Sequence, residues 1–388
     1  MCGDSLIALG LPLLPAMRDQ MIGDRPAMTP GTELAPGPNA VNDQTGRTGS
    51  ERGEWFDATW NPTAGCSVYS PGCEHCYAMR IAARLARMGG KTGARYTGLT
   101  ATERFGPIWT GEMRVSEDLL AWPLLQRRPR RIAVKLISEL FHENLARATV
   151  DLLHAVMQAA HWHRFLVLTK RAERMRAYYT DPETPHRIAE KSNLLQSLIL
   201  PARRRRGHQS RPVRAILAPR GPDLWPLPNL WLGVSVEDQH RMARVGDLLQ
   251  TPSALRWVCF EPLLDRVRPE AVPVGDRYFD GFRGRHYTID GRGRTVPIEG
   301  PAWRPLDWVV AGGEIGAAAR PMHPEWVRRL RDRCVSTGIP FFFRQWGEWA
   351  PPSGDGSGDG ITRVGKRSAG RLLDGRTWDQ VPGTPQAS

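Results

Sequence analysis

The sequence is poor in lysine and has no long uninterrupted hydrophobic run. Lysine accounts for five of the 53 basic residues, so arginine carries most of the formal net charge of +13. Such a bias is typical of GC-rich genomes and by itself indicates no binding function. The apolar segment SLIALGLPLLPAM near the N-terminus contains two prolines and is much shorter than the ~20 residues that cross a bilayer. We therefore expect no membrane anchor.

Two clusters of arginine nonetheless concentrate positive charge, RRPRR at 127–131 and RRRR at 203–206. Basic clusters attract phosphate groups over long distances and release counterions when they bind them. Solvated loops carry such clusters about as often. The charge alone therefore leaves both a nucleic-acid contact and a solvated surface open.

A second Cys-x2-Cys pair and a His-x3-5-His pair are both missing, although structural zinc sites usually need two such pairs. What the chain does have is Cys66, Cys73 and Cys76 in the stretch TWNPTAGCSVYSPGCEHCYAMR. Three thiolates on a cubane iron–sulfur cluster leave one iron free for a ligand. A [4Fe–4S] cluster is the favoured interpretation, ahead of zinc and of an incidental trio of core cysteines.

The remaining cysteines, Cys2, Cys259 and Cys334, are scattered singly along the chain. This usage is typical of metal binding in a reducing compartment and not of a disulfide framework. We therefore expect a cytoplasmic protein.

No Gly-x-Gly-x-x-Gly fingerprint follows the first predicted strand, which counts against a doubly wound nucleotide-binding sheet. Strands are predicted near Thr59 and at 131–136, 165–169, 230–236, 255–260, 308–311 and 340–344. Helices are predicted at 74–87, 148–161, 171–179, 238–249 and 324–337. This alternation indicates an α/β fold, a complete or partial (β/α) TIM-type barrel, with the doubly wound sheet as the alternative.

The composition changes along the chain predict three regions. Residues 1–53 are expected to be a disordered leader, because they are rich in Pro, Gly, Thr and Asn without periodicity. Residues 54–350 form the barrel-like domain, with insertions at about 180–228 and 266–305 over one barrel face. The segment PPSGDGSGDG then predicts a flexible tail over 351–388.

Polar side chains follow the predicted strands, and in barrels of this type the active site lies at those carboxyl ends. Charged groups gathered there need a ligand or partner to offset their desolvation. The candidates for cofactor binding are Ser138, Glu139, Ser235 and Glu237. The candidates for substrate contact or pocket lining are Asn61, His142, Lys170, Glu261, Glu314 and Arg344.

Eight short motifs in fixed order identify a resemblance over residues 54–350. The chain resembles the phage-associated three-Cys-motif protein family, found in phages and bacteria, and its cysteine loop is similar to that of radical S-adenosylmethionine enzymes, including spore photoproduct lyase-like repair enzymes. The loop here is longer, Cys-x6-Cys-x2-Cys in place of Cys-x3-Cys-x2-Cys. The motifs are TWNPTAGC, SPGCEHCYA, LFHE, VLTKR, LGVSVE, FEPLL, AGGEIG and FFFRQWGEW.

The resemblance implies a [4Fe–4S] cluster on Cys66, Cys73 and Cys76, S-adenosylmethionine on the open iron, and an external electron donor. That superfamily places a Gly-Gly-Glu after its second strand, whereas Gly312-Gly313-Glu314 here follows the sixth. Ser138 and Glu139 are therefore the positional candidates for that role. The resulting hypothesis is a radical enzyme that acts on nucleic acid or a nucleotide. The alternative is a non-enzymatic nucleic-acid-binding protein with a structural metal site.

Overall fold

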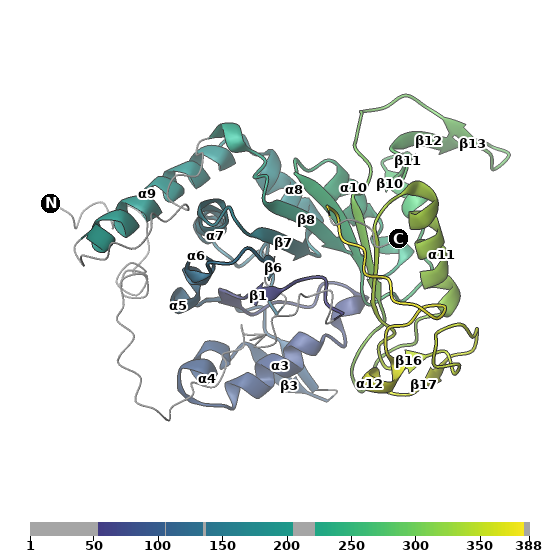
Figure 1. Cartoon of the computed structure of the whole chain (residues 1–388), viewed down its shortest axis with the longest axis horizontal. Helices are drawn as coiled ribbons and strands as arrows, with labels where there is room; N and C mark the ends of the chain where they lie inside the picture. Colours follow the sequence, from purple (N-terminus) through teal and green to yellow (C-terminus); the bar gives the residue numbers. More distant parts are fainter. Residues whose placement is uncertain (1–52, 105, 135–136, 205–221, 384–388) are drawn as a thin grey trace.

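Seven parallel strands form one curved sheet in the computed structural model of the protein, which describes residues 53–104, 106–134, 137–204 and 222–383 (Figure 1). Each strand pairs with the next one along the chain. The sheet curls into a half-barrel, so the predicted α/β fold with a partial (β/α) barrel is confirmed. The strands are β1 Ala58–Trp60, β6 Arg131–Val134, β7 Arg164–Thr169, β8 Leu230–Ser235, β9 Leu255–Phe260, β14 Trp308–Gly312 and β15 Phe341–Gln345.

The convex face of the sheet is covered by helices, as the 3.6-residue apolar periodicity predicts. The covering helices bury their apolar sides against the strands in one large core. Pro324 in the first turn and Gly338, with a φ of +72°, at the C-cap delimit the last of them, as expected. These helices are α7 Arg147–Ala159, α8 Ala172–Thr180, α10 Ala243–Leu249 and α11 Pro324–Thr337.

The concave face of the sheet is filled by tryptophans. Trp257 and Trp308 are fully buried, and the Trp55 ring lies 4.8 Å from that of Trp257. The Nε1 of Trp308 donates a hydrogen bond of 2.9 Å to the backbone oxygen of Gln380. Because both faces of the sheet are buried, its strands are continuous apolar runs. A cavity inside the half-barrel lies beyond this tryptophan layer, toward the carboxyl ends of the strands.

Small elements between β1 and β6 build a separate lobe around the cysteine loop (Figure 1). The lobe has its own apolar core, which includes Leu99 and Trp109 and packs against Cys66 and Cys76. Its elements are β2 Thr63–Ala64, η2 Pro71–Cys73, α3 Tyr77–Ala86, α4 Gly90–Tyr96, β3 Thr100–Glu103, β4 Gly106–Trp109 and β5 Arg114–Val115. Two short helices, α5 Glu117–Leu120 and α6 Trp122–Leu125, then lead into β6.

The two predicted insertions adopt different structures. The first contributes α9 Thr184–Arg204, which packs on α7, and the short η4 Pro222–Leu224. The second forms a four-stranded antiparallel sheet that replaces a crossover helix between β9 and β14 (Figure 1). Its elements are η6 Pro269–Ala271, β10 Val272–Val274, β11 Arg277–Asp280, β12 Arg285–Ile289 and β13 Thr295–Pro297.

The segment after residue 350 packs against the sheet, whereas we expected a flexible tail. β16 Trp349–Ala350 pairs with β17 Thr362–Arg363, and α12 Lys366–Ala369 follows. Leu373 is fully buried, and the backbone N–H of Phe343 on β15 donates to Trp378 O at 2.8 Å. The glycine-rich composition of 351–360 therefore marks a loop, and the apolar residues beyond it return the chain to the core.

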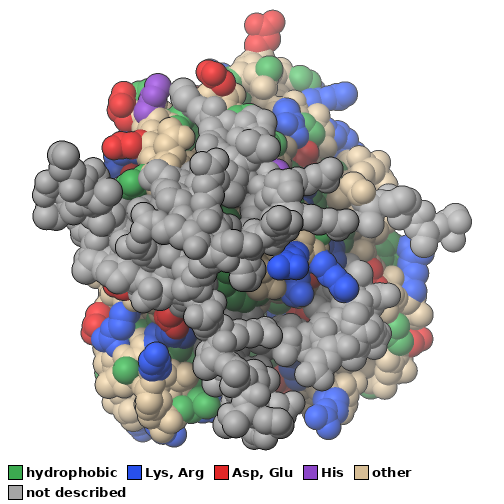
Figure 2. All heavy atoms as spheres, turned by 60° about the vertical axis from the view of Figure 1, so that its left-hand side comes forward, with side chains coloured by type: hydrophobic (Ala, Val, Ile, Leu, Met, Phe, Trp, Pro, Cys, Tyr) green, Lys and Arg blue, Asp and Glu red, His purple; other side chains and the backbone are tan. Residues whose placement is uncertain are grey.

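Several predictions from the sequence concern the N-terminal leader, the two arginine clusters and membrane anchoring. Nearly all of the predicted leader, residues 1–52, and the side chains of the 203–206 arginine cluster lie outside the described residues. The 127–131 cluster leads into the first residue of β6 and so lies at the end of the sheet opposite the carboxyl ends. Where Figure 2 shows described residues, basic and acidic side chains are interspersed. No helix in the described part of the chain is long and apolar enough to cross a membrane.

A thiol-lined cavity as the candidate functional site

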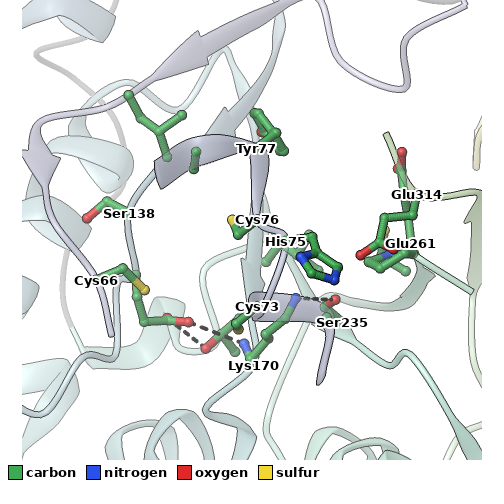
Figure 3. A pocket seen from close by; sticks show the side chains of 18 of the residues that line it. Cys66, Cys73, His75, Cys76, Tyr77, Ser138, Lys170, Ser235, Glu261 and Glu314 are labelled. Carbon is green, nitrogen blue, oxygen red and sulfur yellow. Dashed lines mark hydrogen bonds between the residues drawn. The ribbon is translucent and has the colours of Figure 1, made fainter. Parts of the chain in front are cut away.

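A cavity of about 190 Å³ opens at the carboxyl ends of the strands. Six strand ends and the cysteine loop contribute to its lining, so residues more than 270 positions apart in sequence meet there. Figure 3 shows the sulfurs of Cys66 and Cys76 facing the central space, with Glu261 and Glu314 across from them. The predicted residues that line it are Cys66, Cys73, Cys76, Ser138, Glu139, Lys170, Ser235, Glu261, Glu314 and Arg344.

The alternation of side chains along each strand explains why these particular residues reach the cavity. On β7 the inward positions carry Leu166 and Leu168 in the concave-face core, and the next inward position is Lys170. On β9 the same step of two leads from Cys259 to Glu261. On these two strands, apolar inward residues along the strand are therefore followed by one polar residue at its carboxyl end.

Glycines allow the cysteine loop to approach the strand ends. Gly65 has a φ of +99°, and a Cβ there would lie 1.9 Å from the backbone oxygen of Glu112. A Cβ on Gly72 would lie 2.4 Å from Cγ of Glu237. A larger residue at Gly72 would push the loop away from the sheet, and one at Gly65 would push it away from the segment before β5. These glycines therefore help to fix where Cys66 and Cys73 lie.

The second and third cysteines are placed by short helical elements. Cys73 is the last residue of η2, and its backbone N–H donates to Ser70 O at 2.8 Å. Cys76 is the N-cap of α3, where backbone N–H groups point toward its thiol. Burial nevertheless outweighs these hydrogen bonds and raises the pKa of Cys76.

The three loop thiols are a group of soft ligands suited to a soft metal, and Cys259 is a further thiol in the lining of the same cavity. Burial, and next Glu139, raises the pKa of Cys66 to about 12, and the Cys73 and Cys76 thiols add to that effect. Among the described residues, no three His, Cys, Asp or Glu side chains are close enough together to hold a single metal ion. A zinc ion takes its thiolates at ~2.3 Å from one centre, whereas in a cubane cluster each thiolate binds a different iron.

Lys170 joins the cysteine loop to the fourth strand of the sheet. Its Nζ donates to Ser235 Oγ at 2.9 Å (Figure 3) and lies 3.3 Å from Glu237 Oε1. Glu237 also accepts from Ser70 Oγ at 2.7 Å. Burial acts to lower the pKa of Lys170, but the Glu237 carboxylate and the Cys73 and Cys76 thiols raise it overall. Lys170 therefore presents a permanent positive charge beside two of the three thiols.

A second network fixes the loop on the side of Cys66. Arg171 donates from Nη2 to Ser67 Oγ at 2.6 Å and from Nε to Glu143 Oε2 at 2.8 Å. Partial burial acts to raise the pKa of Glu143, but the Arg171 guanidinium lowers it to about 2. Glu139 accepts from Thr169 Oγ1 at 2.7 Å and lies 3.5 Å from Arg171. Both carboxylates thus hold the guanidinium against the loop.

Two further ion pairs line the opposite wall. Arg344 donates from Nη1 to Glu261 Oε1 at 2.6 Å and also bonds both oxygens of Glu54. Arg320 forms a two-bond pair with Glu314, at 2.9 and 2.7 Å. The same guanidinium donates to Pro71 O at 2.8 Å, so it connects Glu314 to the cysteine loop. Every carboxylate on this wall is therefore already paired.

Three of the predicted residues are not part of the cavity lining. Asn61 is buried between β1 and β2. His142 is buried behind the lining, with Nε2 3.0 Å from Ser67 Oγ, and burial lowers its pKa. Glu237 is fully buried beneath Lys170, between Ser70 and Arg244, whose Nη1 donates to Glu237 Oε2 at 2.9 Å. His142 and Glu237 therefore contact residues that support the loop.

Several residues around the site were not among those predicted. Trp55 and Phe56 line the cavity from the segment before β1. Tyr69, about half exposed, lies between two guanidinium groups, 4.8 Å from Arg171 and 5.4 Å from Arg244. The sequence offered one signal for Tyr69. This tyrosine lies in SVYS, between Cys66 and Cys73, and a tyrosine inside a metal-binding loop lies close to the groups that cover that loop.

The fold and the site together define the class of this protein. It is an α/β half-barrel with thiols, an ammonium group and guanidinium groups around one cavity. The chain belongs to the family described as "Protein of unknown function (DUF5131)", whose model matches residues 51–382. No curated protein and no solved structure gives a significant match. The family match covers the cysteine loop, all seven strands and the packed tail.

Proposed function

We propose that this protein holds a [4Fe–4S] cluster on Cys66, Cys73 and Cys76 and acts as a radical S-adenosylmethionine-type enzyme on nucleic acid or a nucleotide. The observation that carries the proposal is that three thiols from one loop, one buried and two half-buried, line a single cavity. The resemblance to the phage-associated three-Cys-motif family and to radical S-adenosylmethionine enzymes supports the same cofactor.

When bound, such a cluster supplies an electron that cleaves S-adenosylmethionine and so starts radical chemistry. The residues of this chain would hold the reactants and exclude water. Lys170 lies beside Cys73 and Cys76, where its charge offsets the negative charge of the thiolates. The paired carboxylates Glu261 and Glu314 face the cavity from the other wall and are available to accept hydrogen bonds from an amino group.

Cys259 lines the same cavity but is not part of the proposed ligand set. Burial first, then Glu261, raises its pKa, and Lys170 and Arg344 are its other strong electrostatic neighbours. The pKa values of the loop cysteines Cys66 and Cys76 are instead raised in part by the other thiols of the loop. Cys259 is left out of the proposed ligand set because it lies on β9, outside the loop that carries the other three thiols.

The test is anaerobic reconstitution with iron and sulfide, followed by iron and sulfide analysis and visible absorption. We expect about four irons per chain and a broad visible band, both lost in Cys73→Ala. Cys334→Ala is the matched control, since that thiol is buried in α11 away from the cavity. Cys259→Ala should also keep the cluster. Stoichiometric zinc without a cluster would reject the proposal.

The enzymatic part requires a second measurement. The reconstituted protein is incubated with S-adenosylmethionine and a strong reductant in place of the cellular electron donor, and 5′-deoxyadenosine is quantified. Formation of this product supports a radical enzyme. A cluster-free protein that binds oligonucleotides with steep salt dependence and makes no 5′-deoxyadenosine would instead be the non-enzymatic nucleic-acid-binding protein.

A further inference from the structure

The four-stranded sheet β10–β13 has one face buried and one face exposed. Phe279 is fully buried and His286 nearly so, and the Trp303 ring lies 5.3 Å from the former and 4.9 Å from the latter. Side chains alternate between the faces of a strand. The neighbours of Phe279 and His286 along their strands therefore point outward, away from the core of the protein.

The outward face carries a stacked pair of tyrosines at its centre. Tyr278 and Tyr287 are direct cross-strand partners, with ring centroids 5.5 Å apart and planes inclined by 20°. The Tyr287 hydroxyl donates a hydrogen bond of 2.8 Å to Glu270 O, which fixes the ring before any ligand arrives. Both tyrosines are only half-buried. Unpaired bases stack on such rings in single-strand-binding sheets.

Arginines surround this pair in excess of carboxylates. Residues 266–305 contain eight arginines, no lysine and five carboxylates. Asp280 and Asp290 are already paired within the sheet, with Arg283 at 3.2 Å and with Arg294 at 2.9 Å. Exposed Arg285, two positions before Tyr287 on the same face, has no carboxylate within 4.0 Å among the described residues. The same holds for exposed Arg292 in the turn before β13.

We propose that the outward face of the β10–β13 sheet binds a single-stranded nucleic acid, with bases on Tyr278 and Tyr287 and phosphates on Arg285 and Arg292. An apolar protein partner would need a larger hydrophobic surface, and Ile289, 47% exposed, is the one large aliphatic residue on this face. The proposal rests on the proposed function only in taking the bound strand as the substrate. The surface itself is separate from the thiol-lined cavity.

The test is fluorescence anisotropy of labelled 15-nucleotide DNA and RNA strands with the reconstituted full-length chain. Tyr278→Ala/Tyr287→Ala should weaken binding of the preferred strand about tenfold or more, since each stacked base contributes substantially. Arg285→Ala/Arg292→Ala changes two exposed residues that form no ion pair with the described residues. This variant still tests the proposal if the tyrosine variant unfolds. It should weaken binding and reduce the salt dependence by about one phosphate contact per arginine.

The matched control is Arg127→Ala/Arg128→Ala, which removes two exposed arginines at the far end of β6 and should bind as the wild type does. Absence of binding to both strands, equal binding by all variants, or weakening only in the control would each overturn the proposal. Cluster content and 5′-deoxyadenosine formation are measured in the same variants and should not change. Failure of the sheet as a binding surface is therefore distinguishable from failure of the proposed enzyme.

Discussion

The charged residues around the cavity form ion pairs with oppositely charged side chains. Lys170 has Glu237, Arg344 has Glu261 and Glu54, and Glu314 has Arg320. A buried charge without a partner costs several kcal/mol in free energy, so pairing is what makes so polar a cavity compatible with a folded sheet. It also means that a ligand meets side chains already fixed in orientation, which lowers the entropy lost on binding.

His163 provides a residue-scale prediction for stability against pH. It is fully buried, accepts from Arg130 N–H at Nδ1 (3.2 Å), and so carries its proton on Nε2, which donates to Pro123 O (3.0 Å). Burial lowers its pKa from 6.5 to about 4. Because the unfolded chain takes up this proton first, the free energy of unfolding should fall as the pH drops from about 6.5 toward 4, by up to ~3 kcal/mol.

Urea unfolding at pH 7 and pH 4.5 measures this effect. His163→Asn should flatten the pH dependence in that window, even if it lowers the stability at both pH values. His186→Asn is the control, because His186 is exposed on α9 and should leave the slope unchanged. A His163→Asn protein with the wild-type slope would show that other groups cause the acid sensitivity.

At the scale of elements, the cysteine loop is held by side chains from the segments that follow three strands, β7, β8 and β14. Arg171 bonds Ser67, Glu237 bonds Ser70, and Arg320 bonds Pro71. We expect Arg320→Met to loosen this loop, because it removes both bonds to Glu314 and the bond to the loop backbone. Hydrogen bonds to charged groups contribute about 1.5–3 kcal/mol each. The reconstituted variant should therefore lose iron to a chelator on the order of tenfold faster.

The chelation rate is followed by absorbance under anaerobic conditions. Arg333→Met on α11 changes an exposed arginine and should behave as the wild type. Arg320→Lys keeps the charge without the planar two-bond geometry and should fall between the two. Equal rates for Arg320→Met and Arg333→Met would mean that Arg320 does not position the loop.

Most elements were predictable because their sequences are consistent with their surroundings. The seven strands are short apolar runs, such as RFLVLT of β7, and the structure buries both faces of each. The meeting of the cysteine loop with Lys170 and Glu261 followed from the rule that parallel strands share a carboxyl edge. For these parts, local pattern and tertiary environment agree.

Other parts could not be predicted because long-range packing decides them. The strands of the β10–β13 sheet have three to five residues with weak apolar alternation, and glycines and arginines dominate the segment. The burial of Glu237 behind the cavity depends on the close approach of Gly72, which no local pattern reveals. The return of the tail to β15 was hidden by the glycine-rich loop before it.

At the scale of the whole molecule, the half-barrel has an open concave face that other segments must cover. Trp55 and Phe56 from the N-terminal side and Val381 from the tail join the tryptophans of the sheet in one core. The tail also covers the edge strand: Phe342 forms an isolated bridge with Asp379, and the Trp378 ring lies 6.0 Å from that of Phe341. The tail thereby protects an edge that would otherwise expose unpaired backbone groups.

Trp378→Ala tests this role of the tail. Trp378 is 8% exposed, packs in the main core, and has the Arg376 guanidinium 3.6 Å from its ring centroid. Replacing a buried tryptophan by alanine costs about 3–5 kcal/mol, so we expect a loss of about 3 kcal/mol in the free energy of unfolding, measured in urea. Leu372→Ala, at a 37% exposed position in the same tail, should change it by less than about 0.5 kcal/mol. Equal, small losses in both variants would show that the tail is dispensable and that the edge of the half-barrel is stable without it.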